Sequence, residues 1–86
     1  MATFFIPAAL RELCGGATRV ELEATTISEL VCALDVRFPG AAARLVTDEG
    51  PRPGWAIAVD GVMVRRLSTK LSPAAEVHFV PAIGGG

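Results

Sequence analysis

One amphipathic helix constrains this chain more than any other feature of its sequence. Between residues 26 and 38, apolar side chains recur at i, i+3, i+4, i+7 and i+11, the spacing of one helical face, at Ile27, Leu30, Val31, Leu34 and Phe38. Thr26 and Glu29 have the spacing of a capping box, with Thr26 as N-cap and Glu29 reaching back to it. Pro39-Gly40 ends the helix. A single helix of this kind can cover only one face of a small sheet, which the remaining residues must build.

Short β-branched and aromatic runs, separated by turn residues, supply that sheet. The runs 55–59 and 62–64 flank Asp60-Gly61. An Asp-Gly pair between two apolar runs is typical of a two-residue hairpin, because both turn positions require positive φ. Further strands are expected at residues 3–6, 19–23 and 76–80. Short helical turns are predicted at 8–13 and 41–46, and a loop at 47–54.

The predicted order of elements, β-β-α-β-β-β, is that of the β-grasp fold. We therefore expect an α+β domain with a mixed sheet of about four to five strands and one main helix packed across one face. A chain of 86 residues has room for one core only. We place the domain at residues 1–81 and a flexible C-terminal tail at residues 82–86.

The charge balance argues against several classes of function. Eight Lys and Arg stand against nine Asp and Glu, a net charge of −1, whereas nucleic-acid binding needs a clustered basic excess. No apolar run approaches the ~20 residues of a membrane span, and the first residues lack the features of a signal peptide. We expect a cytoplasmic monomer that binds neither nucleic acid nor membrane. Cys14 and Cys32 should stay as thiols there; either could be reactive, but a small, half-buried filler is the commoner role.

No set of side chains predicts catalysis. His78 is the only histidine, and without clustered ligands it cannot form an ordinary metal site. A nucleophile, a base and an orienting group cannot be assembled, so we expect no catalytic residue, no metal and no bound cofactor. Arg65, Arg66 and Lys70 form a small basic cluster, which is either a solvated edge or a partner contact.

The C-terminal glycines are the most unusual chemical feature of the chain. Gly84-Gly85-Gly86 follows the last predicted strand through Pro81-Ala82-Ile83, without a polar linker. Terminal glycines are often no more than a floppy end. Glycine has no Cβ, however, so such an arm can pass through a narrow channel and adopt any φ and ψ inside it. The tail therefore suits presentation of a terminal carboxylate to the active site of another protein.

The same residues resemble a known family. Residues 81–86, Pro-Ala-Ile-Gly-Gly-Gly, are similar to the C-terminal Pro-(Pro/Ala)-Val-x-Gly-Gly of the MoaD/ThiS-type sulfur carriers, which are ubiquitin-like proteins. Phe5-Ile6-Pro7, followed by Leu10-Arg11-Glu12, resembles the family's first strand and turn, and residues 26–34 resemble its helix. Asp60 stands where the family often has Asn. The long loop at 47–54 favours the MoaD-like and CysO-like branch over the shorter ThiS.

The resemblance implies a chemical role for the tail. In the family, an E1-like (MoeB/ThiF-type) adenylating enzyme uses ATP to adenylate the terminal carboxylate, here that of Gly86. A sulfur donor then displaces AMP, and the resulting thiocarboxylate donates sulfur to a biosynthetic enzyme for molybdopterin, cysteine or another sulfur-containing metabolite. Gly84 and Gly85 would form the access arm. The carrier itself is a protein co-substrate and not an enzyme.

Two other functions remain open. A ubiquitin-like modifier would join Gly86 to target lysines through an isopeptide bond and would share the activation step. Lys70 is the only lysine, which disfavours chains of this protein on itself. The third possibility is a plain interaction module whose tail has no chemical role.

A partner-binding surface is expected on the sheet face opposite the helix. Strand alternation directs Phe4, Ile6, Val77 and Phe79 toward the helix and Phe5, His78 and Val80 to the opposite face, beside Ala56 and Ala58. An uncovered apolar sheet face is a candidate docking site for the activating and accepting enzymes. We assign this surface to Phe5, Pro7, His78, Val80 and Pro81.

Overall fold

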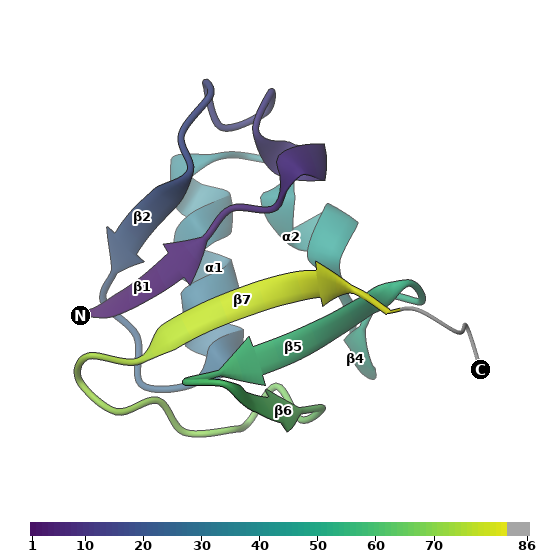
Figure 1. Ribbon diagram of the computed structural model, residues 1–86. Helices are drawn as coiled ribbons and strands as arrows, with labels where there is room; N and C mark the ends of the chain where they lie inside the picture. Colours follow the sequence, from purple (N-terminus) through teal and green to yellow (C-terminus); the bar gives the residue numbers. More distant parts are fainter. Residues whose placement is uncertain (83–86) are drawn as a thin grey trace.

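A mixed sheet of five strands, in the order β2-β1-β7-β5-β6, forms the centre of the computed structural model, which describes residues 1–82. Its strands are β1 (Ala2–Phe5), β2 (Arg19–Leu22), β5 (Trp55–Val59), β6 (Val62–Val64) and β7 (Glu76–Pro81). The central pair, β1 and β7, is parallel, and the other pairs are antiparallel. Helix α1 (Ile27–Arg37) crosses one face (Figure 1). The predicted α+β β-grasp architecture is confirmed.

The core lies between α1 and the sheet. Leu30 and Leu34 of the helix and Phe4, Ile57 and Val77 of the sheet are completely buried. The rings of Phe4 and Phe79, on neighbouring strands, meet edge to face with centroids 5.8 Å apart, a geometry that adds to the stabilisation from burial. The strand faces predicted for β1 and β7 are therefore confirmed. Phe38, expected on the helical face, caps the helix and is only half-buried.

The N-terminus of α1 is capped partly by its own sequence and partly by a distant segment. The Glu29 amide donates to Thr26 Oγ1 at a distance of 3.1 Å, as the capping box predicts. The Glu29 carboxylate, however, accepts from the amide and the hydroxyl of Thr25, at 2.8 Å each, one residue before the N-cap. The first two helical amides, those of Ile27 and Ser28, donate to carbonyl oxygens of residues 69 and 67. The loop after β6 thus satisfies donors that the helix cannot satisfy itself.

The predicted Asp-Gly hairpin is confirmed at β5–β6. Asp60 and Gly61 have φ of 50° and 83°. Asp60 also joins the hairpin to β7. Its amide donates to the Glu76 carbonyl oxygen, and its Oδ1 accepts from the Glu76 amide, each with a donor–acceptor distance of 2.9 Å. The turn residue therefore supports a tertiary contact in addition to the turn.

The smaller elements differ in part from the prediction. The expected helical turns are the 3₁₀ turn η1 (Ala8–Leu10) and helix α2 (Ala41–Leu45). The expected loop at 47–54 instead contains a two-stranded sheet of β3 (Val46–Thr47) and β4 (Gly50–Pro51). Gly50 permits it, because its φ is 141° and a Cβ there would lie 3.2 Å from the Arg65 carbonyl oxygen. None of the helices in residues 1–82 is long and apolar enough to cross a membrane.

Candidate functional site

The last described residues, Pro81 and Ala82, lie beside the start of β5. β7 runs to Pro81, which pairs with Trp55. The next amide, that of Ala82, donates to the Gly54 carbonyl over 2.8 Å. The backbone is therefore attached to the sheet up to residue 82. The predicted reaction centre, Gly86, and its access arm, Gly84 and Gly85, lie outside the described residues.

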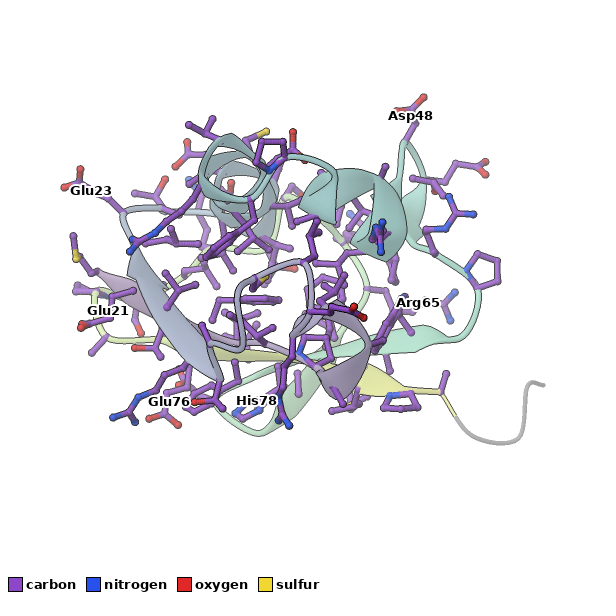
Figure 2. All side chains as sticks on the ribbon, turned by 90° about the horizontal axis from the view of Figure 1, so that it is seen from above. Glu21, Glu23, Asp48, Arg65, Glu76 and His78 are labelled. Carbon is purple, nitrogen blue, oxygen red and sulfur yellow. The ribbon has the colours of Figure 1, made fainter. Side chains whose placement is uncertain are left out.

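The sheet face opposite the helices carries the side chains predicted for partner binding. Phe5 of β1 and His78 of β7 are register neighbours, and their rings stack with centroids 4.2 Å apart and planes 4° apart. Figure 2 shows His78 pointing away from the sheet on the side opposite the helices. Val80, on the same strand and face, is 36% exposed. Ala56 and Ala58 lie opposite Val80 and His78, so these residues form one continuous surface.

The two prolines of the predicted surface lie at one end of the sheet. Pro7 follows β1 and is half-buried, whereas Pro81 ends β7 and is exposed. Because β1 and β7 run parallel, their C-terminal ends share the same edge. Ala82, the last described residue, follows Pro81 at that edge.

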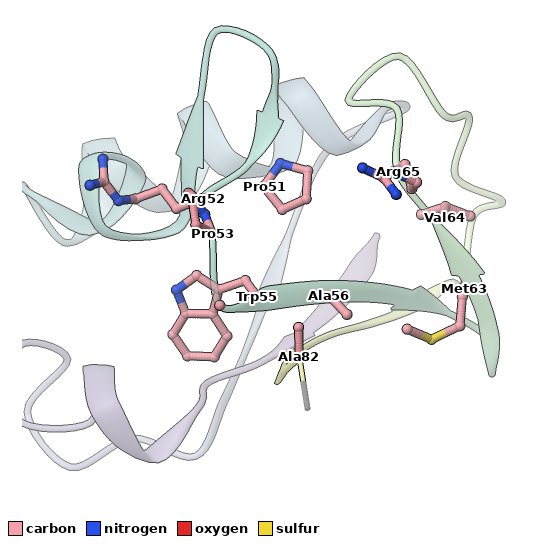
Figure 3. Close-up of a pocket in the computed structure, with 10 residues that line it drawn as sticks. Pro51, Arg52, Pro53, Trp55, Ala56, Met63, Val64, Arg65 and Ala82 are labelled. Atoms are coloured by element: carbon pink, nitrogen blue, oxygen red, sulfur yellow. The ribbon is translucent and has the colours of Figure 1, made fainter. Parts of the chain in front are cut away.

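A groove beside Ala82 was not predicted from the sequence. Its volume is about 610 Å³. It is lined by the segment 51–56, by residues 63–65 of β6 and its continuation, and by Ala82, which follows β7 (Figure 3). Trp55 has the largest side chain of the lining. Its indole Nε1 donates to the Arg44 carbonyl over 3.0 Å, and its ring meets Phe79 edge to face. The one tryptophan of the chain, at the start of a predicted strand, was the only sequence signal that could have indicated this groove.

The two cysteines have opposite environments. Cys14 is buried, and desolvation raises the pKa of its thiol, which makes it a poor nucleophile. Cys32 is exposed on α1, so the prediction that it is half-buried was wrong. Its position off the apolar face of the helix explains the difference. Within residues 1–82, no group of three or more His, Cys, Asp or Glu side chains is placed to hold a metal ion.

Comparisons with solved structures define the class of protein. The chain is similar to the CysO chain of the Amycolatopsis orientalis BexX/CysO complex, with a TM-score of 0.89, 28% identity and full coverage of both chains. It is also similar to CysO of Mycobacterium tuberculosis, described as an antigen, with a TM-score of 0.88, 25% identity, and coverage of 96% of this chain and 100% of that one. A putative molybdopterin converting factor subunit 1 of Pyrococcus furiosus shares the fold at 21% identity and a TM-score of 0.70, with 95% and 97% of the two chains covered. The chain is thus a ubiquitin-like β-grasp protein of the MoaD/ThiS type.

The family follows from the sequence profile. The profile of the ThiS family matches residues 5–86, which includes the terminal glycines. The chain therefore belongs to the ThiS family. A search of curated proteins gives no significant match.

Proposed function

We propose that this protein is a sulfur carrier whose Gly86 carboxylate is adenylated and then converted to a thiocarboxylate. The observation that carries the proposal is the ThiS-family match, which extends through the last glycine. In this proposal the folded part, residues 1–81, presents residues 82–86 as the reactive arm. The carrier holds no cofactor and has no catalytic residue of its own.

The chemistry requires activation, because a carboxylate resists attack by nucleophiles. An E1-like enzyme would transfer AMP from ATP to the Gly86 carboxylate and release pyrophosphate. Sulfide sulfur would then attack the carbonyl carbon, so that a C–S bond forms, the C–O bond to AMP breaks and AMP leaves. The product would pass its sulfur to a biosynthetic enzyme. We place the reaction in the cytoplasm, where ATP is available.

The exposed sheet face supports this role by offering a docking surface. Phe5, His78 and Val80 combine a stacked ring pair with a partly exposed valine on the face that α1 does not cover. Such an apolar patch on a small domain favours association with another protein. The similar CysO chain of Amycolatopsis orientalis was solved in complex with BexX, which agrees with a protein partner for this chain.

Intact-mass measurement tests the proposal directly. The chain would be incubated with a MoeB/ThiF-type enzyme, ATP and a sulfide source. Conversion of –COOH to –COSH should add about 16 Da, and only when ATP is present, because an unactivated carboxylate does not accept sulfide. A chain that never gains this mass with an enzyme active on its own carrier would refute the proposal.

Two tail variants serve as controls. Gly85→Ala should slow the conversion, because it adds a Cβ where the arm passes through a narrow channel. One alanine added after Gly86 should prevent it until that residue is removed. Both variants should melt like the wild type. Undiminished sulfur transfer by the extended variant would show that the carboxylate of Gly86 is not the acceptor.

The modifier alternative shares the adenylation step and differs in the final acceptor. The small archaeal modifier protein 1 of Haloferax volcanii matches this chain at 20% identity and a TM-score of 0.73, which supports the fold alone. Conjugates that survive denaturation and contain Gly86 joined to a target lysine would favour that alternative.

A further inference from the structure

We propose that the groove beside Ala82 binds an extended acidic segment of the enzyme that acts on the C-terminus. This inference rests on the proposed sulfur-carrier function and names the chemistry of the partner. The occupant is a protein segment with carboxylate side chains and at least one apolar side chain. It differs from the surface around Phe5 and His78, which is apolar and lies on the sheet face.

The shape of the groove suits a short stretch of polypeptide. Its volume of about 610 Å³ lies within the range of sites that enclose a few side chains or a small ligand. The floor is mainly apolar and comes from two prolines, Trp55, Ala56, Met63 and Val64. Figure 3 shows the Trp55 ring at one side of this floor and Met63 at the other. A rigid indole held by its own hydrogen bond is a typical anchor in protein interfaces.

The charges of the groove select an acidic occupant. Arg52 and Arg65 are the only charged residues among those that line it, and both are exposed. Figure 3 shows the Arg65 guanidinium turned toward Pro51, whereas the Arg52 side chain extends outward at the opposite end of the groove, away from Arg65. Asp48, in the turn between β3 and β4, does not line the groove and points outward from the molecule, away from Arg65 (Figure 2). The groove is therefore cationic on a protein whose net charge is −1.

The position of the groove identifies the partner. Ala82 is part of the lining, and its amide is bonded to Gly54, which also lines the groove. Gly86, the proposed reaction centre, is four residues beyond Ala82 in the sequence, and four residues span at most about 14 Å when fully extended. An enzyme that holds the Gly86 carboxylate in its active site must therefore bring its own surface over this part of the domain.

The groove also adjoins the sheet face. Ala56 belongs to the groove lining and lies opposite Val80 on the exposed face. One enzyme surface can therefore contact both regions, with an apolar area on the sheet face and an acidic segment in the groove. Charges of this kind contribute mainly to association rate and specificity.

A defined peptide tests the chemistry of the groove without any turnover. The full ¹⁵N-labelled chain would be titrated with a capped ten-residue peptide of alternating Asp and Leu, and amide and indole shifts recorded. The largest shifts are expected at Gly54, Trp55, Met63 and Val64. The same peptide with Lys in place of Asp should not shift these signals. Added salt should weaken binding of the Asp peptide.

Charge-reversal variants locate the binding. The groove variant Arg52→Glu/Arg65→Glu should weaken binding of the Asp peptide by roughly tenfold. The control variant Arg11→Glu/Arg37→Glu makes the same change in net charge at two exposed arginines outside the lining and outside the basic cluster of Arg65, Arg66 and Lys70. It should weaken binding by less than about twofold. Equal weakening by both variants, or peptide shifts that avoid the groove, would overturn the proposal. So would binding that requires removal of residues 83–86, because the chain's own end would then be the occupant.

The same variants decide whether the tail-modifying enzyme is the partner. In the ATP-dependent reaction, the groove variant should raise the apparent KM for the carrier about tenfold with kcat unchanged, since the loss is in binding alone. The control variant should match the wild type. An unchanged KM in the groove variant would refute the assignment of the partner. Failure of the wild type to react at all would instead refute the sulfur-carrier function. The peptide titration would then show by itself whether the groove binds an acidic segment.

Discussion

Replacing Leu34 with alanine tests how α1 is held on the sheet. The Leu34 side chain is completely buried, and α1 supplies most of the layer that covers the sheet (Figure 1). Truncation removes the transfer free energy of the lost carbons and leaves a cavity that a close-packed core fills only partly. The free energy of unfolding should therefore fall by about 2–5 kcal/mol.

Val36, on the same helix, provides a matched control. Its side chain is 84% exposed, so Val36→Ala removes almost no buried area. Alanine also has a higher helix propensity than valine. We expect the stability of this variant to stay within about 0.5 kcal/mol of the wild type.

Urea unfolding followed by circular dichroism gives both values. The midpoint should fall clearly for Leu34→Ala, with a similar slope, since the surface exposed on unfolding is nearly the same. In a domain of this size the corresponding loss in Tm is at least about 8 °C. Equal midpoints for the two variants, or a loss below about 1 kcal/mol for Leu34→Ala, would contradict the packing of α1 described above.

Three further predictions concern the docking face, the helix cap and the hairpin. Val80→Asp should leave the fold intact, because the side chain is already 36% exposed, yet reduce adenylation. Equal rates for Val80→Asp and the control Val36→Asp would remove the sheet face from docking. Hydrogen bonds from the Thr25 amide and hydroxyl lower the pKa of Glu29 from 4.5. The stability that these bonds contribute is therefore present above pH 4.5 and lost as pH falls through the lowered pKa. The free energy of unfolding, measured as pH is lowered, should show this loss in the wild type. Glu29→Gln, which cannot titrate at this position, should lack this part of the pH dependence. Asp60→Ala should cost about 0.5–1.5 kcal/mol, because it removes the bond from the Glu76 amide. Asp60→Asn keeps an acceptor oxygen and tolerates positive φ, so thermal melts that rank the two variants equally would contradict this role.

Most of the fold follows from patterns that act over a few residues. The apolar spacing from Ile27 to Leu34 predicts both the helix and the face that it buries, because side chains three and four apart share one side of a helix. The turn at Asp60-Gly61 is predicted as directly, because few residues accept positive φ. Alternation in β1 and β7 also predicts which side chains of the sheet face away from the helix.

The candidate site was predictable only in part. The sequence singled out the glycines and the face of Phe5, His78 and Val80, because strand alternation and the character of the tail are local properties. It did not predict the groove, because Arg52, Trp55, Met63 and Ala82 come from three separate segments. Their proximity depends on the pairing of β5 with both β6 and β7.

The sequence alone therefore determined the helix, the hairpin, the strand faces and the chemistry available at the C-terminus. Only the tertiary structure decided the parallel pairing of β1 with β7, from opposite ends of the chain. It also decided that the carbonyls of residues 67 and 69 cap α1 and that Arg52 and Arg65 line the same groove. The physical reason is the separation along the sequence over which each effect acts. Propensity and periodicity act between neighbours along the chain, whereas these contacts form when burial of the shared core brings distant segments together.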